Sequence, residues 1–156
     1  MFSGASNVGL LDSDVEEPKS KLRRYVLTGL LLALMLAGGV AYLLRFHAEK
    51  QTVESFFQAI AAGDLRTAYK IWQPIPTFTF EDFQGQFGPD GYFGPIKSYH
   101  FILAQNPPRG GSGVVVIVDV SSLSPFPDAA DPAARKTIKE VRLWVERKDQ
   151  SLSFPP

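Results

Sequence analysis

The sequence predicts an α+β protein in which one membrane-spanning helix precedes a single small domain of helices packed on an antiparallel sheet. Three observations lead to this prediction. Residues 25–44 are apolar without a charge, residues 47–87 show helical periodicity, and residues 96–154 are rich in β-branched and aromatic residues between turn signals. Because the helices come first and the strands follow, the two kinds of element are expected to pack as layers of one domain.

Composition narrows the classes of function. The 156 residues include 16 basic and 16 acidic side chains, so there is no excess of basic charge of the kind that binds nucleic acid. The absence of cysteine excludes disulfides, thiolate zinc sites and thiol nucleophiles. The two histidines, His47 and His100, are too far apart in sequence to form a metal-binding motif. We therefore expect no nucleic-acid partner, no metal and no cofactor.

The segment 25–44, YVLTGLLLALMLAGGVAYLL, is the predicted membrane anchor. Twenty helical residues extend about 30 Å, which is the thickness of the hydrocarbon core of a bilayer. A secretory signal peptide is the alternative, since Gly39-Val40-Ala41 has the small-x-small pattern of a cleavage site. The apolar run is longer than the core of a signal peptide, and about 24 residues precede it, which favours an uncleaved anchor.

The flanking charges predict the orientation of the anchor. Four basic residues precede it closely and two follow it: Lys19, Lys21, Arg23 and Arg24, then Arg45 and Lys50. Basic residues resist translocation, so we expect the tail 1–24 in the cytoplasm and the domain 45–156 outside it, which in a bacterium is the periplasm. The tail carries an acidic cluster and has no periodic apolar face, so it is expected to be disordered.

Small residues recur every four positions along the anchor: Gly29, Ala33, Ala37 and Ala41. They line one stripe of a helix, and small residues at this spacing let two helix backbones approach closely in lipid. The stripe is a candidate contact with another membrane helix. The alternative is that Gly and Ala are simply common in membrane helices.

Three helices are expected after the anchor. Residues 47–62 place apolar side chains at the 3, 4, 7, 8 spacing of an amphipathic helix. A glycine ends this helix, and Asp64 provides the N-cap of the next, residues 65–72. Thr79, with Asp82 three residues later, has the pattern of a capping box and begins a third short helix.

Four strands are expected after the helices. The segments 96–105 and 114–122 are rich in β-branched and aromatic residues and are separated by a Gly- and Pro-rich reversal. After a Pro- and Ala-rich loop, 123–135, the segment 137–148 alternates apolar and polar residues, so one face of this strand should be buried. A tight turn then leads to a short last strand, 151–154.

Residues 53–72, VESFFQAIAAGDLRTAYKIW, resemble the opening helices of the nuclear transport factor 2-like superfamily, also called cystatin-like α+β cone folds. Gly63-Asp64 and Ala68-Tyr69 occupy the places of the turn and the Ala-Tyr pair of that group. The resemblance covers about residues 48–154 and implies helices on a curved sheet. The anchor and the segment FGPIK, 93–97, are also similar to the membrane-anchored cytochrome oxidase assembly factor family.

The superfamily includes enzymes, ligand binders and scaffolds, and its enzymes place acid and base groups inside the cone. By this resemblance Asp119 is the candidate base, because a carboxylate in a closed cone would have a raised pKa. His100 is its candidate partner, and Tyr69 and Trp72 are candidates for the lining of an apolar pocket. The alternatives are an Asp119 that is exposed or paired with Arg142, a histidine without a role, and aromatic residues that fill the core.

No catalytic group is recognisably assembled, so we predict a non-enzymatic protein. The predicted role is a membrane-anchored, extracytoplasmic protein-interaction or assembly module whose partner is a protein, such as another membrane protein. Phe126, between two prolines in the loop, and Trp144, on the polar face of its strand, are the candidate partner contacts. The alternative function is a small-molecule-binding or isomerase-like domain that uses Asp119 as a base.

Overall fold

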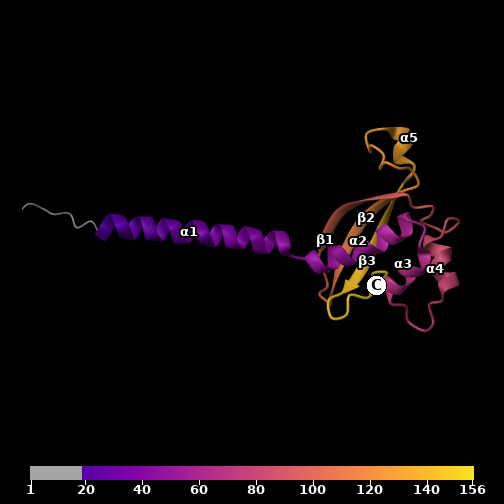
Figure 1. Cartoon of the computed structure of the whole chain (residues 1–156), viewed down its shortest axis with the longest axis horizontal. Coiled ribbons are helices and arrows are strands. Elements are labelled where there is room, and N and C mark those ends of the chain that lie inside the picture. Colours follow the sequence, from indigo (N-terminus) through magenta and orange to yellow (C-terminus); the bar gives the residue numbers. More distant parts are fainter. Residues whose placement is uncertain (1–18) are drawn as a thin grey trace, which may run out of the picture. The chain divides into compact units, whose positions relative to one another are not determined.

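The computed structural model describes residues 19–156, and the chain divides into two units, residues 1–45 and 46–156, which are treated separately below (Figure 1). The first unit contains helix α1 (Lys19–Leu44). This helix is long and apolar enough to cross a membrane, and none of its apolar stretch is buried within the protein. It begins before the predicted anchor, because the Lys, Leu and Arg residues ahead of Tyr25 are good helix formers. The expectation for residues 1–18 of the tail lies outside the described residues.

Three helices open the second unit: α2 (His47–Ala61), α3 (Leu65–Trp72) and α4 (Phe80–Phe87). The N-termini of α3 and α4 are fixed by the predicted caps. The Asp64 carboxylate accepts a hydrogen bond from the Thr67 backbone N–H at 3.0 Å, and Thr79 and Asp82 form a reciprocal capping box. Gly63 lies between α2 and α3 at φ 81°, a left-handed conformation that glycine adopts without strain.

The strands form one antiparallel sheet in the order β1-β2-β3-β4. They are β1 (Ser98–Gln105), β2 (Gly113–Ser121), β3 (Ile138–Glu146) and β4 (Leu152–Ser153). The connection from β2 to β3 contains a short helix, α5 (Pro132–Arg135), where the sequence predicted only a loop. The predicted α+β class, with helices followed by an antiparallel sheet, is confirmed.

The helices cover one face of the sheet (Figure 1). That face presents alternate residues of the two central strands, all of them at most 1% exposed: Val114, Val116, Val118, Val120, Val141, Leu143 and Val145. The helices contribute an aromatic cluster in which Phe56 lies 5.1–6.0 Å, ring centre to ring centre, from Phe57, Trp72, Phe83 and Phe87. Aromatic side chains therefore fill the space between the helices and the sheet, which is the interior of the predicted cone.

Candidate interaction surface

The other face of the sheet, which we call the outer face, carries the alternate residues of the same strands. Since Val114, Val116, Val118 and Val120 point to the helices, Val115, Ile117 and Asp119 point away from them. The cross-strand register places three rows on the outer face: Trp144–Val115–Gln105, Arg142–Ile117–Leu103 and Glu140–Asp119–His100. The outer face is thus apolar at one end and charged at the other.

Trp144 dominates the apolar end. Its indole ring lies on the backbone of the β1–β2 hairpin, and a Cβ atom added at Gly113 would be 2.3 Å from two of its atoms. Only glycine therefore allows this approach. Beside the indole is an open groove of about 300 Å³, lined by Val115, Arg109, Gly110 and four prolines, Pro107, Pro108, Pro155 and Pro156. Leu103 of the second row is 44% exposed, and Ile102, at the irregularity of β1 between Phe101 and Leu103, is 50% exposed.

The second row crosses the middle of the outer face. Ile117 is only 8% exposed although no helix covers it, so its neighbours on the adjacent strands shield it. One of these is Arg142, whose Nε lies 2.6 Å from Glu140 Oε1 in an ion pair. Arg142 therefore pairs along its own strand with Glu140 and not across the sheet with Asp119. Both partners are exposed, and such pairs contribute at most about 1 kcal/mol to stability.

The third row brings Asp119 and His100 opposite each other in the register. Partial burial raises the pKa of the Asp119 carboxyl, the nearby Glu140 raises it further, and His100 opposes the shift. The ring of Phe126 lies 5.7 Å from the His100 ring, and the Ser98 hydroxyl donates to the Leu123 carbonyl at 2.5 Å. These contacts fix the start of the 123–135 loop, including Phe126, beside the charged end of the outer face.

The four residues proposed to line a pocket inside the cone do not converge. Asp119 and His100 belong to the outer face, whereas Trp72 lies in the core on the helical side and is 5% exposed. Tyr69 is also on the helical side, and its hydroxyl donates to the Phe78 carbonyl at 2.7 Å. Asp119 therefore does not face an enclosed cavity, because the covered face of β2 is formed by its valines. Among residues 19–156 there is no group of three or more His, Cys, Asp or Glu side chains that could hold a metal ion.

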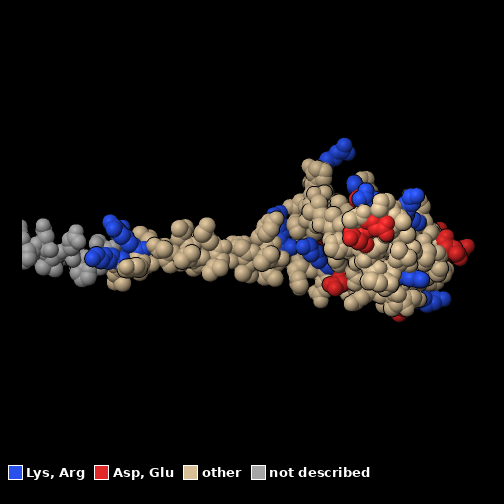
Figure 2. Space-filling model, turned by 90° about the horizontal axis from the view of Figure 1, so that it is seen from above, with Lys and Arg blue, Asp and Glu red and all other residues tan. Residues whose placement is uncertain are grey.

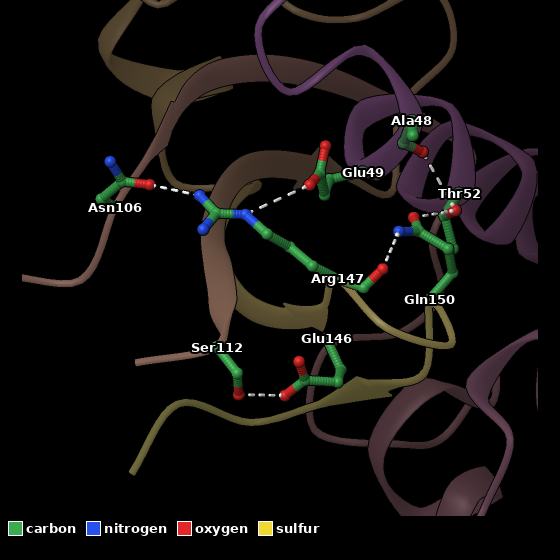
Figure 3. Close-up of polar contacts among 8 residues, drawn as sticks. All are labelled: Ala48, Glu49, Thr52, Asn106, Ser112, Glu146, Arg147 and Gln150. Atoms are coloured by element: carbon green, nitrogen blue, oxygen red, sulfur yellow. Dashed lines mark hydrogen bonds and ion pairs between the residues drawn. The ribbon is translucent and has the colours of Figure 1, made fainter. Parts of the chain in front are cut away.

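A polar network at the start of α2 was not predicted (Figure 3). Glu49, in the first turn of α2, is only 8% exposed, and its carboxylate lies 3.6 Å from Arg147 Nε. The Arg147 guanidinium also donates to Asn106 Oδ1 at 2.5 Å, and the Thr52 hydroxyl donates to Gln150 Oε1 at 3.0 Å. The network joins α2 to the β1–β2 loop and to the β3–β4 turn.

The small residues proposed as a helix contact lie on α1. A Cβ added at Gly29 would meet nothing within 4 Å, and Ala33, Ala37 and Ala41 are exposed within this chain. The stripe therefore presents no steric obstacle to a second helix, and its role stays a prediction.

Comparison with known proteins leaves the family of the chain unassigned. No family model matches it, and no curated protein or solved structure matches it either.

Proposed function

We propose that the protein is a membrane-anchored interaction module. In this proposal α1 spans the membrane, and the domain that follows it lies on the extracytoplasmic side and docks a protein partner on the outer face. The observation that carries the proposal is the Trp144 surface: an aromatic ring seated on glycines, beside exposed apolar side chains and an arginine-containing row. Partly exposed Trp with Arg nearby is the composition of binding hot spots.

The remaining features support the same role. Membrane attachment raises the local concentration of the module and restricts its orientation, so that an interface of modest size suffices. Phe126, held beside His100, extends the surface toward the 123–135 loop. The stripe Gly29, Ala33, Ala37 and Ala41 offers a second contact within the membrane. The element order agrees with the nuclear transport factor 2-like resemblance, and we include membership of that superfamily in the proposal.

The test is capture of partners by crosslinking the full chain in its native membrane, with identification by mass spectrometry. Trp144→Ala should abolish the partners captured by the wild type. Ile75→Ala, which removes a 66% exposed apolar side chain between α3 and α4, should keep them. Thermal unfolding of both variants separates a lost interface from a lost fold. Unchanged capture by a folded Trp144→Ala protein would refute the outer face as the docking surface.

Orientation has its own test, because the chain contains no native cysteine. A cysteine placed at Pro108 in the domain should react with a membrane-impermeant maleimide added from outside the cell membrane. A cysteine placed in the tail at Ser13 should react only after the membrane is permeabilised. The reverse pattern would place the domain in the cytoplasm.

The alternative function, a small-molecule or isomerase-like site, is favoured by one observation: Asp119 has a raised pKa and lies opposite His100. On the outer face this pair is open to solvent on one side, so any such site would need a second molecule to enclose it. Binding or turnover that is lost in Asp119→Asn and kept in Trp144→Ala would establish this function in place of docking.

A further inference from the structure

The domain has one end at which the chain enters it, and this end collects basic charge. The proximal end consists of three segments, residues 46–50, 106–112 and 146–150, and the network around Arg147 joins them. Together they contain four basic and three acidic residues, whereas the rest of the domain contains seven basic and nine acidic residues. Figure 2 shows Lys and Arg side chains gathered at the end of the globular domain where the chain enters.

All three acidic side chains of the proximal end are bound within the domain. Glu49 pairs with Arg147, and the Glu146 carboxylate accepts a hydrogen bond from the Ser112 hydroxyl at 2.6 Å. The Asp149 carboxylate accepts hydrogen bonds from the backbone N–H and the hydroxyl of Ser151, at 3.0 and 2.7 Å. These contacts fix the positions of the three carboxylates; Glu146 and Asp149 keep their negative charge, and Asp149 also interacts electrostatically with Lys148.

Three basic side chains of the proximal end have no such contact. Lys50 on α2, Arg109 at the tip of the β1–β2 loop and Lys148 in the β3–β4 turn are exposed. None of the three side chains makes a hydrogen bond or an ion pair within residues 19–156. They come from three different segments, which are joined by the Arg147–Asn106 hydrogen bond and the Arg147–Glu49 ion pair, so the three cations lie on one connected frame.

Chain connectivity places this end at a membrane surface. Only Arg45 and Phe46 separate the last residue of α1 from the first residue of α2. At no more than about 3.6 Å per residue, the three steps from the end of α1 to the start of α2 span at most about 11 Å whatever the orientation of the domain. If α1 spans the bilayer, the proximal end is therefore held at the level of the lipid headgroups. This step rests on the proposed membrane anchor.

We propose that the proximal end binds anionic phospholipid headgroups through Lys50, Arg109 and Lys148, and that this contact sets how the domain lies on the membrane. Each basic residue near an anionic surface strengthens binding about fivefold, and the effect is screened by salt. Removal of all three should weaken the contact about a hundredfold. Because Arg109 also lines the groove beside Trp144, the lipid contact would border the proposed partner surface on β1–β3.

The experiment uses the full chain reconstituted into phosphatidylcholine vesicles with or without phosphatidylglycerol. A cysteine at Pro108, beside Arg109, carries an environment-sensitive fluorophore, and spin-labelled lipid headgroups serve as quencher. We expect quenching to be strong with phosphatidylglycerol, weak without it, and reversed by added salt. The triple variant K50Q/R109Q/K148Q should reduce quenching to the level seen in phosphatidylcholine.

The matched control is K97Q/R135Q/K136Q, which removes the same charge at the opposite end of the sheet, where β1 begins and β2 ends. This variant should quench like the wild type. Equal quenching in both lipids, or a full response from K50Q/R109Q/K148Q, would overturn the inference while leaving the anchor intact. Alkaline extraction of the chain from the vesicles would instead overturn the anchor, and with it this inference.

Discussion

Because the indole of Trp144 lies directly on Gly113, the loss of stability caused by Gly113→Ala can be predicted. The added Cβ would be 2.3 Å from the indole Cε2 and Nε1 atoms, and favourable carbon contacts are about 3.5–4.0 Å, so the ring must move by more than about 1 Å. Overpacking of this kind costs about 1–3 kcal/mol. The backbone of Gly113 is not in the left-handed region, so the substitution itself brings no φ strain.

The effect of Gly113→Ala on the free energy of unfolding should change from destabilising to stabilising once the indole is absent. In a Trp144→Ala background the three atoms nearest to the new Cβ are gone, since all three belong to Trp144. Alanine is then favoured over glycine within a strand by about 0.5–1 kcal/mol. The double-mutant cycle should therefore give a coupling free energy of about 1.5–4 kcal/mol between the two positions.

The assay is urea unfolding of the full chain in detergent, followed by fluorescence. Trp72 is 5% exposed in the core and is present in all four proteins of the cycle, so it reports unfolding in each. Gly85→Ala in α4 is the control, because its Cβ would meet nothing within 4 Å and should stabilise both backgrounds equally. An equal cost of Gly113→Ala in both backgrounds would show that the indole does not lie on Gly113.

Three further predictions concern the charged row, the α2 network and the core. The raised pKa of Asp119 means that ionisation disfavours the folded state, so Asp119→Asn should raise the urea midpoint at neutral pH and give no gain below about pH 4; a gain at both would contradict the raised pKa. Arg147→Met leaves Glu49 without its ion-pair partner and should lower the free energy of unfolding by about 1–3 kcal/mol. The double variant with Glu49→Met should recover most of that loss of stability, because no unpaired carboxylate then remains. Phe56→Ala, at a fully buried ring, should cost about 3–5 kcal/mol by the same assay.

Features with a local cause could be predicted from the sequence. The Thr79–Asp82 capping box and the Asp64 cap depend on residues three apart, and both are present. The α5 helix was missed although Asp131 and Pro132 carry a signal for it, an N-cap followed by proline at the first helical position. A run rich in Pro and Ala outweighed that signal.

The placement of Asp119 shows where local pattern fails. Alternation assigns it to the same face as Val115 and Ile117, and the structure agrees. It does not say which face the helices cover, because residues 114–118 of β2 are apolar on both faces. The choice depends on the packing of the helices, α2 above all, against one face of the sheet, and these contacts are not local in sequence.

The Glu49–Arg147 contact could not be predicted either, because it too depends on residues far apart in the sequence. The two residues are 98 positions apart, and only the completed sheet brings the end of β3 to the start of α2. A weak signal exists, because Glu49 is spaced four and seven residues before Val53 and Phe56 and therefore lies on the apolar stripe of its helix. An acidic residue on a buried stripe needs a partner, but periodicity cannot name it.

The apolar character of both faces of β2 bears directly on where a partner would bind. Val115 and Ile117 are 9% and 8% exposed without a covering layer, so neighbouring strands already shield them and a partner gains little by contacting them. The surface that a partner could still bury belongs to the side chains that shield Val115 and Ile117, namely Trp144 and the exposed Leu103. A partner that covers the outer face should therefore depend strongly on Trp144 and weakly on Ile117. Ile117→Val would then affect stability, and Trp144→Ala would affect binding, which distinguishes a docking face from an exposed part of the core.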